Sequence, residues 1–181
     1  MKKIILLSIV LLLTACQSTM FKKEGRYIEA KAKPFIEITQ SLRVAPNSAR
    51  AYLQQGEVIS AGQLNLYDIN CEIEINTVSE QPQVIAPGIY HILSINPDES
   101  PIVMFKPVMV ASLTLARGGG SGSPVDIKRF YRFKLSSQNP NSKTQVRSML
   151  CRGAQDEPYA AILPTFEEMQ QATGEYIKLN F

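Results

Sequence analysis

A series of short apolar runs, each bounded by turn-forming residues, most constrains what this chain can fold into. The runs are rich in β-branched and aromatic residues, and they cover 35–44, 49–58, 71–78, 88–95, 107–116, 125–135, 145–151 and 175–181. Proline, glycine, asparagine and aspartate mark turns at 45–48, 86–88, 96–101, 118–124 and 139–142. Eight strands at this spacing predict an all-β domain, either an antiparallel β-sandwich or a small barrel.

One short C-terminal helix is predicted within this series. Thr165 and Glu168 have the spacing of a capping box, and Phe166 and Met169 form an apolar pair at helical spacing. Gly174 is placed where a helix commonly ends. We expect about two helical turns packed over an open end or an edge of the sheet.

The N-terminus has the layout of a secretory signal peptide. Lys2 and Lys3 precede an apolar run from Ile4 to Leu13 that only Ser8 interrupts. A helix of about ten residues covers roughly 15 Å, half of the hydrocarbon thickness, so this run is too short to span a membrane. Residues 1–15 are therefore predicted to be a cleaved signal peptide.

The stretch Leu13-Thr14-Ala15-Cys16 resembles the lipobox of bacterial lipoproteins. The resemblance implies cleavage before Cys16, diacylation of its sulfur and acylation of its new amino group. Two or more acyl chains anchor a protein stably where one chain does not. Because Gln17 follows, and not an aspartate, the resemblance also implies the outer membrane, with the domain facing the periplasm. The alternative is an ordinary signal peptide with Cys16 near the cleavage site by chance.

The remaining chain is interpreted as a lipidated N-terminus with a flexible tether at 16–33, followed by a single β domain at 34–181. The tether is polar and lacks sustained periodicity. The glycine-rich segment 118–124 resembles an interdomain linker in composition, but the chain after it is too short for a comfortable second domain. We interpret it as a hairpin tip within one domain.

The charge balance excludes a global electrostatic argument for nucleic-acid binding. The full chain has 19 basic and 16 acidic residues, and losing Lys2 and Lys3 leaves 17 against 16, a net charge of +1 in place of +3.

The three cysteines also fit an exported lipoprotein. With Cys16 lipidated, Cys71 and Cys151 remain as an even pair, for which a disulfide is the default expectation in an oxidising compartment. Two buried free thiols are the alternative.

No sequence motif assembles a catalytic site, and the domain is predicted not to be an enzyme. His91, the only histidine, lies inside an apolar run, and no motif directs a serine or thiol toward it. With one histidine and no CxxC pair the spacing of a zinc site is missing, and no metal or cofactor is predicted.

Acidic residues cluster at Asp68, Glu72 and Glu74. Alternation places Glu72 and Glu74 on one face of a strand, with Cys71 and Ile73 on the other. Paired carboxylates can perform acid–base chemistry or bind calcium. We favour the simpler interpretation, the solvated face of a half-buried strand.

The segment 127–135 carries the candidate partner-binding residues. Ile127, Tyr131, Phe133 and Leu135 share one face, with Arg129 among them. The other face is predicted to present three cations around an exposed aromatic ring: Lys128, Phe130, Arg132 and Lys134. Such a face could contact lipid headgroups, a phosphate-bearing glycolipid or an acidic partner. The alternative is an edge strand protected by its charges.

Together these features predict a non-catalytic accessory or scaffold lipoprotein that binds another envelope component. A carrier of a lipid or other apolar ligand is the alternative, since a small barrel can enclose one. A hydrolase using Glu72 or Glu74 is the third candidate.

Overall fold

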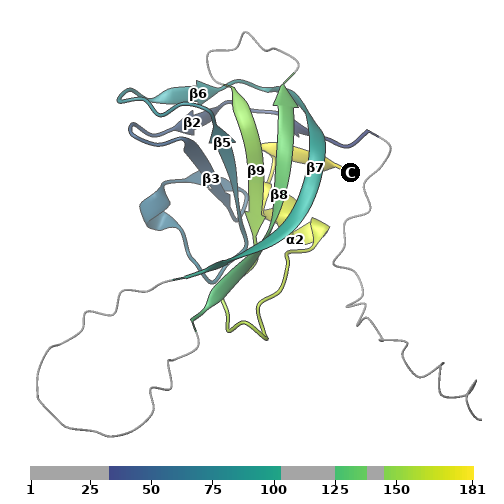
Figure 1. Cartoon of the computed structure of the whole chain (residues 1–181). Helices are drawn as coiled ribbons and strands as arrows, with labels where there is room; N and C mark the ends of the chain where they lie inside the picture. Colours follow the sequence, from purple (N-terminus) through teal and green to yellow (C-terminus); the bar gives the residue numbers. More distant parts are fainter. Residues whose placement is uncertain (1–32, 103–124, 138–144) are drawn as a thin grey trace, which may run out of the picture.

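The computed structural model describes residues 33–102, 125–137 and 145–181, and strands dominate it (Figure 1). The strands are β1 (Phe35–Ile38), β2 (Leu42–Val44), β3 (Arg50–Gln54), β4 (Glu57–Ile59), β5 (Asn70–Ile75), β6 (Gln83–Ile85), β7 (Gly88–Pro101), β8 (Ile127–Ser137), β9 (Val146–Arg152) and β10 (Ile177–Asn180). A 3₁₀ turn, η1 (Ala61–Gln63), and one helix, α2 (Phe166–Thr173), complete the elements of the described residues. The all-β prediction with one short C-terminal helix is confirmed.

The strands form one large antiparallel sheet and one small sheet. The large sheet has eight strands in the order β10-β1-β7-β8-β9-β5-β3-β4, and β2 pairs with β6 in the second sheet. Figure 1 shows the large sheet curled, with α2 on its inner side. The end strands β10 and β4 do not pair with each other, so the architecture is a half-barrel.

The hydrophobic core lies between the concave face of the sheet and α2. Leu53, Ile73, Phe133 and Met149 point inward from four neighbouring strands, and Met169 meets them from the helix; all five are 0% exposed. The helix contacts β3, β5 and β10, and therefore spans the curl of the sheet.

The predicted capping box sets the start of α2. The Thr165 hydroxyl accepts a hydrogen bond from the backbone N–H of Glu168 (3.2 Å), and the Glu168 carboxylate accepts one from the N–H of Thr165 (2.7 Å). This exchange satisfies two N–H groups that a helix start otherwise leaves unpaired.

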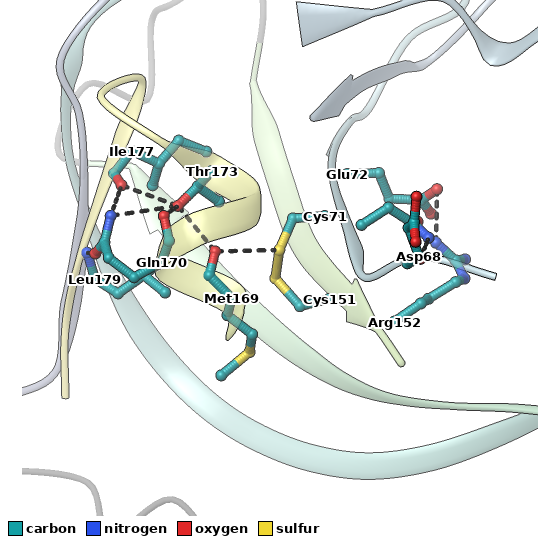
Figure 2. The surroundings of a disulfide bond; sticks show 11 residues. Asp68, Cys71, Glu72, Cys151, Arg152, Met169, Gln170, Thr173, Ile177 and Leu179 are labelled. Carbon is teal, nitrogen blue, oxygen red and sulfur yellow. Dashed lines mark hydrogen bonds and ion pairs between the residues drawn. A yellow bond between two sulfur atoms is a disulfide. The ribbon is translucent and has the colours of Figure 1, made fainter. Parts of the chain in front are cut away.

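A disulfide joins Cys71 of β5 to Cys151 of β9, as predicted (Figure 2). The two residues face each other directly in the register of the two strands. Both are 0% exposed, and the Cys71 Sγ lies 4.0 Å from the carbonyl oxygen of Met169. The bridge therefore fastens two central strands beneath the helix.

The β3–β4 hairpin contacts the C-terminal end of α2. Gln55 and Gly56 form its two-residue tip with φ angles of 54° and 80°, as in a type I′ turn. The Gly56 N–H donates to the carbonyl of Ala172 (3.1 Å). A Cβ placed on Gly174, which has a φ of 56°, would lie 2.6 Å from the Gly56 Cα. Two glycines thus allow this backbone-to-backbone contact.

The predicted turn at 96–101 is wrong, because these residues belong to β7, which pairs with β8 from Tyr90 to Pro101. Pro97 and Pro101 lack an N–H, but they are four residues apart and so face the same side of the strand. β1 pairs only with residues 88–91 of β7. One edge of β7 after residue 91 therefore has no strand partner among the described residues.

Other expectations lie outside the described residues. These are the signal peptide, Cys16, the tether up to residue 32, the run 107–116, the glycine-rich segment and the turn at 139–142. Within the described part, no helix has the length and apolar character needed to cross a membrane.

Candidate functional site

The convex face of the large sheet, opposite the core, carries a cluster of ionisable residues. Strand register aligns it in rows: Glu74 lies between Arg50 and Ser148, and Glu72 lies between Tyr52 and Leu150. We define the convex-face cluster as Arg50, Glu72, Glu74, Lys128, Phe130, Arg132, Lys134, Arg147, Ser148 and Arg152. Its members come from β3, β5, β8 and β9.

Glu74 is the most heavily bonded member, and it is only 4% exposed. Its Oε1 lies 2.8 Å from Nη2 of Arg50, and its Oε2 lies 3.1 Å from Nη2 of Arg147 and 2.6 Å from Oγ of Ser148. Burial raises the pKa of Glu74, but hydrogen bonds from Ser148, Arg50 and Arg147 outweigh it and lower this pKa to about 2. Glu74 is therefore a fixed negative charge at any physiological pH.

Glu72 occupies a similar position one row away and is 2% exposed. Its Oε2 lies 2.7 Å from Nη1 of Arg152, and its Oε1 lies 3.4 Å from Nε of Arg50 without a hydrogen bond to the described residues. In Figure 2, Asp68 and Arg152 gather beside Glu72.

The burial of Glu72 and Glu74 corrects the sequence analysis. Alternation does place both on the face opposite Cys71 and Ile73, but that face is not solvated at these positions. Arginine side chains from both neighbouring strands approach the two carboxylates and displace water from them, since the long arginine stems cover the surface beneath.

A β-bulge brings Arg147 into the cluster. Glu74 pairs with Ser148, but Ile75 pairs with Val146, so one extra residue of β9 lies opposite β5. Simple alternation would place Arg147 on the core side, next to Ser148 on the outer side. The bulge turns the side chain outward instead, where it reaches Glu74.

Phe130 is not the exposed ring that the sequence predicts. It is 3% exposed, and the guanidinium carbons of Arg132 and Arg152 lie 5.4 Å and 5.5 Å from its ring centroid. These are cation–π distances, so the ring is covered by Arg132, one of the three expected cations, and by Arg152, which the sequence analysis did not include.

Lys128 is also buried, at 3% exposure, and its Nζ has no hydrogen bond to the described residues. Burial lowers the pKa of Lys128 to about 8; the positive charge of Arg152 acts in the same direction, and Asp68 and Glu72 oppose it. Of the four residues predicted to bind a partner, only Arg132 and Lys134 reach solvent.

The cluster has a positive balance. It contains six cations (Arg50, Lys128, Arg132, Lys134, Arg147 and Arg152) and two carboxylates, which leaves four positive charges in excess. Three of the arginine side chains remain partly exposed, at 44% for Arg50, 40% for Arg132 and 61% for Arg147. Counting the acidic residues at the margins, Glu57, Asp68 and Asp98, reduces the excess to one positive charge.

His91 lies in β7 with Phe35 and Ser136 as its register partners on the neighbouring strands. The sequence did not predict a serine opposite it. A grouping of three or more histidine, cysteine or acidic side chains able to hold a metal ion is not found within 33–102, 125–137 and 145–181.

Comparisons of this chain with protein-family models, curated proteins and solved structures found no significant match. The interpretation of the site therefore depends on its own geometry and charge.

Proposed function

We propose that this protein is a lipid-anchored accessory protein of the outer membrane, and that its periplasmic domain binds an acidic envelope protein through the convex-face cluster. The anchor and the compartment depend on the lipobox resemblance at Cys16. The binding role depends on one observation, the excess of four positive charges within the convex-face cluster, whose own two carboxylates are already paired.

Arginine geometry supports an anionic partner. A guanidinium presents its N–H groups as a planar fork that matches a carboxylate with two parallel hydrogen bonds. The guanidinium groups of Arg50 and Arg147 are already held by ion pairs with Glu72 and Glu74, so these side chains lose little further conformational freedom when a partner binds. A second carboxylate can therefore bind to a largely ordered surface.

The alternatives have less support. The paired Glu74, with its pKa of about 2, cannot take up a proton near neutral pH, which argues against a hydrolase that uses Glu74. The concave face, where a carrier would hold an apolar ligand, is packed with α2 and with the buried Phe133 and Met149. Binding at the surface is favoured over binding in the interior.

In-cell crosslinking tests the proposal, with the lipoprotein as bait and mass spectrometry as the readout. The double variant Arg132→Glu/Lys134→Glu should lower the yield of the partner adduct at least tenfold, because it replaces two exposed cations by anions. Lys178→Glu, an exposed reversal on β10, is the matched control and should leave the adduct unchanged. An unaltered adduct yield in the double variant would contradict the proposal and leave Arg132 and Lys134 as charges that only protect the strand from aggregation.

A further inference from the structure

A groove of about 520 Å³ lies at the β4 end of the large sheet. Three segments line it: four residues of 43–48, which runs from β2 into the loop after it, residues 50–52 of β3, and residues 58–61 from β4 into η1. We infer that this groove docks an extended peptide segment that carries apolar residues next to a carboxylate. The inference rests on the proposed function and names the part of the acidic partner that binds there.

The size and walls of the groove fit a short peptide. Ligand pockets commonly enclose roughly 300 to 1,000 Å³ and are lined mostly by apolar groups. Here Ala51, Tyr52, Val58 and Ile59 supply apolar walls. Apolar peptide side chains would gain contact area there that the open convex face does not offer.

The charged residues that line the groove favour a ligand with a carboxylate. Arg43 and Arg50 line the groove, and none of its lining residues is acidic. Arg50 is already paired with Glu72 and Glu74, whereas the exposed Arg43 forms no ion pair or side-chain hydrogen bond with the described residues. Arg43 is therefore the cation available to a ligand carboxylate.

The backbone of β3 at Arg50 is closed to strand addition. The Ser48 hydroxyl accepts a hydrogen bond from the N–H of Arg50 (3.0 Å) and donates one to its carbonyl oxygen (3.2 Å). Both main-chain groups that an added strand would use at Arg50 are thus occupied. At Arg50 the peptide is therefore recognised through its side chains.

Arg50 belongs to both the groove and the convex-face cluster. A partner lying on the cationic face can therefore extend an acidic apolar segment into the groove without a gap between the two surfaces.

Fluorescence anisotropy on the full mature protein in detergent tests the inference. The probes are blocked, labelled hexapeptides made of alanine, valine and leucine with one aspartate, each paired with its asparagine counterpart. We expect the aspartate peptides to bind at least tenfold more tightly, and Arg43→Ala to remove most of that difference. Ala61→Glu, at an exposed position of the groove, should also weaken their binding several-fold. Equal binding of the two peptide series would overturn the inference.

Two controls separate this inference from the proposed function. Lys134→Glu lies outside the groove, so it should lower the partner adduct in cells and leave peptide binding unchanged. Arg43→Ala should weaken binding of the aspartate peptides, whether or not it changes the yield of the partner adduct in cells. If Arg43→Ala instead affects binding to phosphatidylglycerol vesicles alone, the groove recognises lipid phosphate and the peptide inference is wrong.

Discussion

Glu74 organises the convex face through its bonds to two arginines and a serine. Each of these partners comes from a strand next to β5, so one carboxylate links three strands on the side away from the core. A buried carboxylate with such partners stabilises the fold, whereas the same group without them would destabilise it.

Protonation of Glu74 at low pH should therefore lower the free energy of unfolding. The pKa of Glu74 is about 2 in the folded state and 4.5 ordinarily, so its contribution is complete above pH 4.5 and is lost as the pH falls toward 2. Glu74→Gln should lower the free energy of unfolding by about 2 kcal/mol at pH 7 and flatten its fall between pH 5 and pH 2. Urea denaturation at several pH values measures this. Glu80→Gln, at an exposed carboxylate, should leave the profile unchanged.

Lys128 is expected to destabilise the fold in its charged form, in contrast to Glu74. Its pKa of about 8 lies below the ordinary 10.5, so the folded state disfavours the charged form and stability rises with pH between these values. Lys128→Met should raise the free energy of unfolding by about 1 to 3 kcal/mol at pH 7, because it removes a buried ammonium that has no hydrogen bond to the described residues. The gain should shrink between pH 8 and pH 10. A less stable variant at pH 7 would contradict this account.

Among the elements, the contact between the β3–β4 hairpin and α2 depends on glycine. Gly174→Ala places a Cβ 2.6 Å from the Gly56 Cα at a φ of 56°. The added strain and the displaced hairpin should lower the free energy of unfolding by about 2 kcal/mol or more. Gly62→Ala is the matched control, because a Cβ at Gly62 has no atom within 4 Å and should be nearly neutral. Equal stability of the two variants would show that the hairpin shifts freely.

Local signals predicted several of these elements from the sequence. The capping box set the start of α2, and alternation assigned the two faces of β5 and of β8 correctly. These features depend on residues a few positions apart, so a single chain segment contains them.

The burial of Glu72 and Phe130 could not be predicted in the same way. It depends on which strands lie beside β5 and β8, and so on contacts between residues far apart in the sequence. Alternation cannot distinguish a face covered by arginine side chains from a face covered by water. Arg147 escaped prediction for another reason, since a one-residue bulge reverses the side to which it points.

For the molecule as a whole, the disulfide closes a loop of 80 residues. Such a closure restricts the unfolded chain by roughly 4 to 5 kcal/mol in the entropy model. The double variant Cys71→Ala/Cys151→Ala should therefore lose a few kcal/mol of unfolding free energy in urea. Reduced wild-type protein should approach the same value, and a variant as stable as the oxidised protein would refute the estimate.

The predicted anchor is tested separately from the fold. Cys16→Ser should abolish palmitate labelling and move the domain from the membrane fraction to the soluble fraction, because the acyl chains would no longer be attached. Its urea denaturation should match that of the wild-type domain. Continued labelling of the variant would defeat the lipobox interpretation.

The strand order also has a consequence for how the chain is made. In the large sheet β8 and β9 lie between β7 and β5, although both follow them in the sequence. A nascent chain that ends before residue 127 can form only two separate fragments of the large sheet, β1 with β7 and β5 with β3 and β4, each with an open edge. Long-range pairing of this kind folds late and exposes edges meanwhile. The large sheet therefore cannot close until nearly the whole chain is present, and a factor that shields those edges until then would raise the yield of folded domain.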